Sequence, residues 1–187
     1  FTREITKHTH QAHSIIGNRA YNITEDKRLP LSLLINILGG PTANSRLNIS
    51  VREREGLSYN IEANYTPYTD TGMALIYFSS EHCNADLCRE IIDSEIRKLQ
   101  TERLTARQLS MAKRQYIAQM TISTEGSENY MLGVGRSMLV HGEVDTLEFE
   151  YTAQVHGHGR VHRLEDGTRT AERGVLLFAH GVHRLHI

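Results

Sequence analysis

The chain has 187 residues, 39% of them hydrophobic and 23% charged, which is enough for one sizeable hydrophobic core. Its formal net charge of -1 excludes the strongly basic surface that holds nucleic acids or anionic lipids, so we expect neither as a partner. No apolar run reaches the roughly 18 residues of a membrane span, and no signal peptide is recognisable. We therefore expect a soluble chain of undetermined compartment, with the cytoplasm slightly favoured.

The first predicted elements are a strand and a helix. Residues 12–21 hold a central apolar pair and precede a turn-rich segment, which predicts a partly buried strand. Pro30 opens the next run, in which leucines and isoleucines recur at helical spacing. The Gly39-Gly40 pair is typical of a helix C-terminus. We expect a short, mostly buried helix from Pro30 to Leu38.

A second helix is predicted over residues 44–55. Leu47 and Val51 lie one turn apart and form its buried side, and Gly56 ends it.

A β-hairpin is expected next, over residues 57–65 and 73–78, because turn residues separate these two apolar runs. Every second residue of the first run is apolar or aromatic. This alternation gives Tyr59 and Ile61 the same parity, and residues of one parity face the core.

Three further helices are predicted. The first covers residues 84–100 with an apolar stripe, the second begins at the capping box formed by Thr105 and Gln108, and the third covers residues 128–140. The stripe consists of Leu87, Cys88, Ile91, Ile92, Ile96 and Leu99. The order of elements predicts an α+β domain over residues 1–155, with a mixed, largely antiparallel sheet and helices packed on one face.

The composition changes near Val155. Six of the eleven histidines lie in residues 156–187, where the only clear apolar run is Val175–Ala179. A closing helix or strand is poorly encoded there. We interpret residues 156–187 as an atypical tail rich in His, Arg and Gly, which is disordered, introduced by cloning, or read in a shifted frame.

Candidate metal ligands do not converge. Three histidines lie within residues 8–13, but an extended strand turns the third away from the other two, and zinc needs three or four ligands. The run 162–166 carries Asp where the inverse zinc motif requires His. Cys83 and Cys88 face poorly for a disulfide within a helix. We therefore expect neither a metal site nor a disulfide in this chain.

Arg52 and Tyr59 are the candidate functional residues. If the second helix ends near Gly56, Arg52 lies in its last turn and Tyr59 lies in the strand that follows, so both side chains can project past the same helix end. An Arg supplies a permanent charge with forked donors, and a Tyr supplies a neutral hydroxyl donor. Aimed at one carbonyl oxygen, the two can hold a substrate and stabilise a developing oxyanion. Composition alone favours the alternative of a solvated Arg and a packed Tyr.

Several motifs follow one another in a specific order. They are the Gly39-Gly40 turn, Ser45-Arg46-Leu47, Arg52, Gly56-Leu57-Ser58-Tyr59 and Tyr68-Thr69-Asp70-Thr71-Gly72. In this order, and over roughly Ala12 to Phe149, the chain resembles the C-terminal, non-metal domain of the pitrilysin-like (M16) zinc peptidases. The resemblance implies a two-layer sandwich like that of the mitochondrial processing peptidase and the metalloenzyme LuxS.

The same resemblance implies a function. In this family the N-terminal half binds zinc and carries the general base, and the second half brings an Arg and a Tyr to the substrate; here these are Arg52 and Tyr59. We expect the substrate-binding, non-catalytic half of a zinc-dependent endopeptidase, inactive alone, with no catalytic or metal-binding residue of its own. Its expected partners are a peptide and a metal-binding domain or subunit, with a homodimer as a further option. The alternative is a non-peptidase scaffold or partner subunit on the same fold, as in the core proteins of the respiratory cytochrome bc1 complex.

Overall fold

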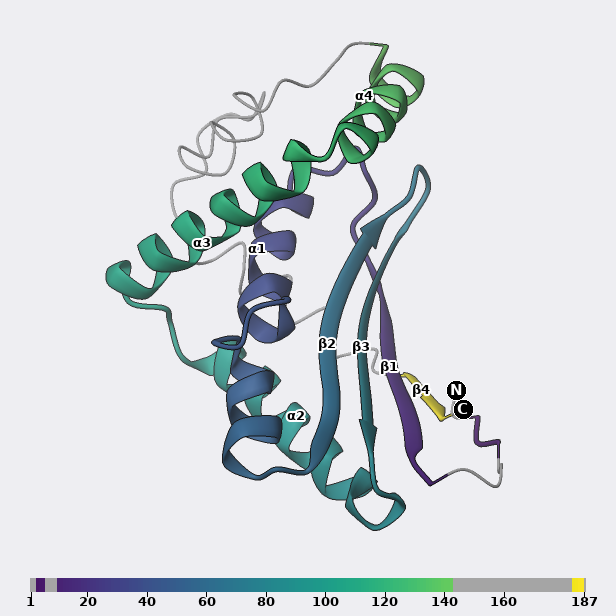
Figure 1. Cartoon of the computed structure of the whole chain (residues 1–187), viewed down its shortest axis with the longest axis vertical. Coiled ribbons are helices and arrows are strands. Elements are labelled where there is room, and N and C mark those ends of the chain that lie inside the picture. The colour runs from purple at the N-terminus through teal and green to yellow at the C-terminus, as the bar shows by residue number, and fades with distance from the viewer. Residues whose placement is uncertain (1–2, 6–9, 143–182, 187) are drawn as a thin grey trace. The chain divides into compact units, whose positions relative to one another are not determined.

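The computed structural model of the chain describes residues 3–5, 10–142 and 183–186 (Figure 1). The described residues form two compact units. One contains the residues up to Arg103 together with strand β4, and the other begins at Leu104.

The first unit is built on an antiparallel sheet. Its strands are β1 (Ala12–Ala20), β2 (Ser58–Pro67), β3 (Gly72–Ser80) and β4 (His183–His186). Among the described residues, the strand order is β2-β3-β1-β4, and each neighbouring pair is antiparallel. Strand β2 therefore lies at an edge, and the predicted hairpin is its pairing with β3.

Helices pack on one face of this sheet, as predicted. The first unit contains α1 (Arg28–Gly39), the π-helical segment η1 (Asn48–Arg54), the short 3-10 helix η2 (His82–Asn84) and α2 (Ala85–Thr101). In Figure 1, α1 and α2 lie on the same side of the sheet. The predicted α+β class and two-layer arrangement are confirmed.

The core lies between the two layers. Ile76 of β3 is the centre of one row, because it pairs with Ile16 of β1 on one side and with Ala63 of β2 on the other, and none of the three is more than 5% exposed. Burial of such apolar side chains is the main favourable term in folding. The other buried apolar residues among those described are Tyr21, the strand residues Ile61, Ala74 and Phe78, and, in the helical layer, Leu31, Leu33, Leu34, Ile35, Leu38, Leu47, Val51, Cys88, Ile92, Ile96 and Leu99.

In the apolar stripe predicted for α2, Cys88, Ile92, Ile96 and Leu99 are buried and Ile91 is half-buried, whereas Leu87 is 46% exposed. Leu87 precedes the buried Cys88 by one residue, so it lies about 100° away around the helix. Conversely, Glu95 lies three residues after Ile92 and four before Leu99, and it is buried. Helical spacing therefore places a carboxylate in the stripe.

The second unit contains α3 (Ala106–Glu125) and α4 (Ser127–His141). The predicted capping box is present: the Gln108 amide donates to the Thr105 hydroxyl at 3.3 Å, and the Thr105 amide donates to the Gln108 side chain at 2.9 Å. Helix α4 ends at Gly142, whose φ of 73° is left-handed and suits glycine.

The prediction for the C-terminal tail concerns residues that lie mostly beyond the described ranges. Residues 143–182 and 187 are outside them, so the nature of the tail over residues 156–187 stays a prediction. Within that tail, β4 pairs with Ser14–Gly17 of β1. None of the described helices is both long and apolar enough to cross a membrane.

Candidate functional site

Arg52 lies in the last turn of η1, on its solvent side. The residue before it, Val51, has no exposed surface, and neither has Leu47 one turn earlier, so the segment is anchored in the core. The hydrogen bonds of η1 follow the π-helical pattern, which is rare and recurs at functional sites. The predicted helix is therefore present, but its hydrogen bonds over Asn48–Arg54 are π-helical and not α-helical.

A glycine cap fixes the backbone between Arg52 and β2. Gly56 adopts a left-handed φ of 63°, which lets the chain reverse. The Gly56 amide donates to the Arg52 carbonyl at 3.1 Å, and the Leu57 amide donates to the Val51 carbonyl at 3.0 Å. The predicted end of the helix at Gly56 is confirmed. The backbone of Arg52 is consequently tied to the start of the strand that carries Tyr59.

Tyr59 is the extra residue of a β-bulge. Ser58 pairs with Ser80 and Asn60 pairs with Ser79, so β2 advances two residues where β3 advances one. The Ser58 hydroxyl is buried and donates to the carbonyl oxygens of Asn60 and Ser79, at 2.8 and 2.9 Å. Bulges of this kind re-aim side chains and are frequent beside active sites.

The bulge changes the exposure predicted for Tyr59. Simple alternation gives Tyr59 the parity of Ile61, but Ile61 is 2% exposed and Tyr59 is 58% exposed. One inserted residue reverses the parity of a strand, and the alternation is correct only from Ile61 onward. The alternative of a packed Tyr is excluded by this exposure.

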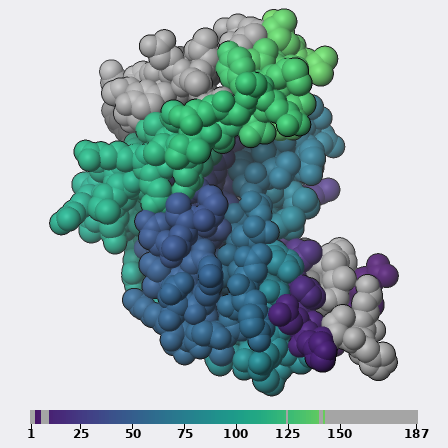
Figure 2. Space-filling model, in the orientation of Figure 1, coloured from purple at the N-terminus to yellow at the C-terminus, as the bar shows by residue number. Residues whose placement is uncertain are grey.

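Both candidate side chains are open to solvent at one helix–strand junction. Figure 2 shows that the blue segment containing η1 and the start of β2 reaches the molecular surface. Within the part of the chain that the structure describes, the Arg52 guanidinium has no hydrogen-bond or ion-pair partner. The Tyr59 hydroxyl donates only weakly, to the Glu81 carboxylate at 3.5 Å. Among the described residues, the junction therefore offers two exposed guanidinium groups without a hydrogen-bond or ion-pair partner, those of Arg52 and Arg54, and one available hydroxyl donor.

A buried thiol, that of Cys88, contacts the backbone of the same junction. Cys88 of α2 donates its S–H to the Leu57 carbonyl at 3.7 Å, and burial raises the pKa of the Cys88 thiol. Cys83 is exposed, and both cysteines are free.

Histidines and acids do not gather into a metal site among the described residues. There, no group of three His, Cys, Asp or Glu side chains could hold an ion. His13 already contacts Tyr77: the Tyr77 hydroxyl lies 2.8 Å from Nδ1 of His13, and the two rings stack. His8 and the run 162–166 lie outside the described residues.

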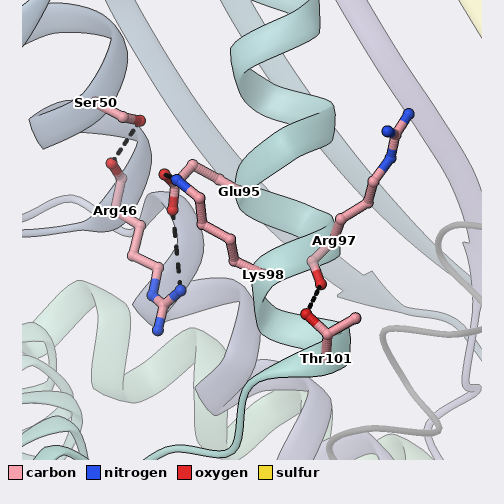
Figure 3. Close-up of polar contacts among 6 residues, drawn as sticks. All are labelled: Arg46, Ser50, Glu95, Arg97, Lys98 and Thr101. Carbon is pink, nitrogen blue, oxygen red and sulfur yellow. Dashed lines mark hydrogen bonds and ion pairs between the residues drawn. The ribbon is translucent and has the colours of Figure 1, made fainter.

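Sequence reasoning missed Glu95. This residue is 8% exposed and forms ion pairs with Lys98 and Arg46, which Figure 3 shows between α2 and the segment that precedes η1. The signal was its spacing from the apolar residues of α2, because it lies on their stripe.

Comparison with known proteins gives a family. The family model described as "Peptidase M16 inactive domain" matches residues 1–116. The "Uncharacterized zinc protease YmxG" of Bacillus subtilis (strain 168) is 30% identical over 142 residues, which cover 76% of this chain and 34% of that protein. The chain thus spans about a third of the length of the curated relatives it matches.

Solved structures share the fold. The peptidase M16 inactive domain from Pseudomonas fluorescens superposes with a TM-score of 0.76 at 17% identity, covering 99% of this chain and 42% of that one. A chain of Complex III2 from Candida albicans superposes with a TM-score of 0.74 at 12% identity, covering 92% of this chain and 42% of that one.

Proposed function

The chain belongs to the peptidase M16 inactive-domain family, and we propose that it is the substrate-binding, non-catalytic half of a zinc-dependent endopeptidase. The observation that carries this proposal is the Arg52 guanidinium, which has no partner among the described residues and stands on a backbone that is fixed by the Gly56 cap. An exposed surface Arg on a flexible loop loses entropy when it binds a ligand, whereas a fixed backbone reduces that loss.

Arg52 and Tyr59 act on the peptide backbone in this proposal. The forked donors of Arg52 and the hydroxyl of Tyr59 hydrogen-bond to carbonyl oxygens of the substrate and hold it in one orientation. When a tetrahedral intermediate forms, the same donors stabilise its negative charge. The weak bond from Tyr59 to Glu81 at 3.5 Å is easily exchanged for one to substrate.

The remaining parts of the active site come from a partner. Since the described residues do not fit a zinc ion, we assign zinc, the attacking water and the general base to a metal-binding domain or subunit. The curated relatives are named zinc proteases, which supports placing the zinc in another domain or subunit. A homodimer is a further possible arrangement of the halves.

The test replaces Arg52 and Tyr59 separately in the enzyme assembled with its metal-binding half. Loss of one oxyanion donor typically lowers kcat by about 100-fold, so we expect kcat/KM for a peptide to fall about 100-fold in Arg52→Ala and about 10-fold or more in Tyr59→Phe. Zinc content stays unchanged in both variants. Arg54→Ala and Tyr68→Phe are the matched controls: Arg54 is exposed two residues after Arg52, Tyr68 is exposed just past the far end of β2, and neither has a proposed role. Unchanged turnover in both Arg52→Ala and Tyr59→Phe would end the proposal.

A second candidate is a non-peptidase scaffold or partner subunit. The structural likeness to a chain of Complex III2 favours it, although at 12% identity this likeness concerns the fold. A scaffold is needed for assembly but not for hydrolysis. In that case the assembled protein would cleave no peptide, and Arg52→Ala would leave complex formation intact.

A further inference from the structure

Glu95 occupies a position in α2 where an apolar residue would be expected. It is 8% exposed and lies among Ile92, Ile96 and Leu99, which face the core. A carboxylate that is removed from water is costly unless charged partners compensate it. The two partners of Glu95 therefore explain how the residue is tolerated there, and they differ in what they connect.

Lys98 and Arg46 both approach the Glu95 carboxylate (Figure 3). The Lys98 ammonium lies 2.7 Å from Oε1, but Lys98 is on the same helix and its side chain is 47% exposed, so this bond acts within α2. The Arg46 guanidinium lies 3.9 Å from Oε2, which is an ion pair and not a hydrogen bond. Arg46 belongs to the segment that enters η1, so only this pair joins two elements.

This contact lies at the start of η1. Arg46 begins the helical segment, and its carbonyl accepts a hydrogen bond from the Ser50 hydroxyl at 2.8 Å. Leu47 and Val51 bury the apolar side of the segment, and Asn48 and Ser50 are buried beside them. Arg52 projects from the solvent side, so a rotation of the segment would displace it.

We propose that Glu95 is a positioning residue for Arg52. Through Arg46 it ties the start of η1 to α2, limits the rotation of η1 and so sets the direction of the Arg52 side chain. Glu95 itself touches no substrate. The catalytic consequence of this device rests on the function proposed for Arg52, whereas the coupling of Glu95 to η1 does not.

Hydrogen exchange in the intact protein tests the coupling. Glu95→Gln keeps the shape of the side chain and removes its charge. We expect the Gly56 and Leu57 amides, which donate to Arg52 and Val51, to exchange about three- to five-fold faster, while hairpin amides such as that of Phe78 are unchanged. Unaltered exchange at Gly56 and Leu57 would overturn the proposal.

Two further variants complete this test. Lys98→Met is the matched control, since it removes the other partner of Glu95 and should leave the exchange of both amides within about two-fold of wild type. If Glu95→Gln does not fold, Arg46→Met replaces it, because Glu95 then keeps Lys98 as a partner. The same acceleration with Lys98→Met as with Glu95→Gln would also overturn the proposal.

Kinetics of the assembled enzyme tests whether Glu95 affects activity through Arg52. Small misplacements of a catalytic group can cost up to about 100-fold, and we expect Glu95→Gln to lower kcat/KM about 10-fold. Because Glu95 acts through Arg52, the same change in an Arg52→Ala background should cause no further loss. An equal loss in both backgrounds would show a general effect on the fold and overturn the proposal. If Arg52→Ala alone has no effect, the proposed function fails, and hydrogen exchange still decides whether Glu95 fixes η1.

Discussion

Arg52 combines a fixed backbone with a free side chain. Its carbonyl accepts the capping bond from Gly56, and its guanidinium has no partner among the described residues. The backbone of Tyr59 is also fixed, by a bulge that the buried Ser58 hydroxyl stabilises. A binding site needs hydrogen-bond donors that are held on a fixed backbone and are free to bind substrate.

Tyr65, further along β2, gives a prediction for pH. Its hydroxyl donates to the Tyr21 carbonyl at 2.6 Å, and burial raises the pKa of Tyr65 from 10.0 to about 12. The folded state therefore holds this proton more tightly than the unfolded state. The stability that results is complete below pH 10 and is lost as the pH rises through 12.

The measurement is urea unfolding at a series of pH values, together with phenolate absorbance. Between pH 10 and 12 the free energy of unfolding should fall more steeply in wild type than in Tyr65→Phe, which at neutral pH is about 1 kcal/mol less stable. Equal slopes for the two proteins would contradict the raised pKa.

The sequence predicted the positions of Arg52 and Tyr59 in the fold better than it predicted their surroundings. Arg52 followed from the position of the helix end at Gly56, a signal that is local and strong. The exposure of Tyr59 could not follow from alternation, because a bulge depends on the pairing with β3 and leaves no mark in the period of β2. Glu95 was detectable from its helical spacing, but its partner Arg46 was not, since the two meet only in the folded chain.

At the scale of elements, the junction of η1 with β2 is the feature that the account depends on. The left-handed Gly56 allows the reversal, and a Cβ at this position would meet no atom within 4 Å. The cost of a substitution there is therefore one of backbone conformation only.

Gly56→Ala isolates this cost. We expect the free energy of unfolding to fall by about 1–2 kcal/mol, because an L-residue adopts left-handed φ unfavourably. Peptidase activity of the assembled enzyme should fall as well, since Arg52 and Tyr59 flank the altered residue. Urea unfolding followed by circular dichroism measures the first effect.

Gly133→Ala in α4 is the control for Gly56→Ala. A Cβ there also meets nothing within 4 Å, but the backbone is helical, so the change should leave stability equal or up to about 1 kcal/mol higher. If both variants unfold at the same urea concentration as wild type, the cap does not require glycine.

At the scale of the whole molecule, the first unit is a sheet with helices on one face, and the family assignment covers residues 1–116. The α+β class could be predicted because the spacing of apolar residues within a short window distinguishes helices from strands. The wider register of η1 could not be predicted, because a spacing of four residues such as that of Leu47 and Val51 fits an α-helix equally well. The division of labour between this chain and a metal-binding half remains our proposal.

Zinc content, measured together with peptide cleavage, tests this division most directly. The chain alone and the enzyme assembled with its metal-binding half would be compared under the same conditions. The account predicts that the chain alone binds no stoichiometric zinc and cleaves no peptide, and that the assembled enzyme does both. A tightly bound zinc ion on this chain alone, together with peptidase activity, would contradict it.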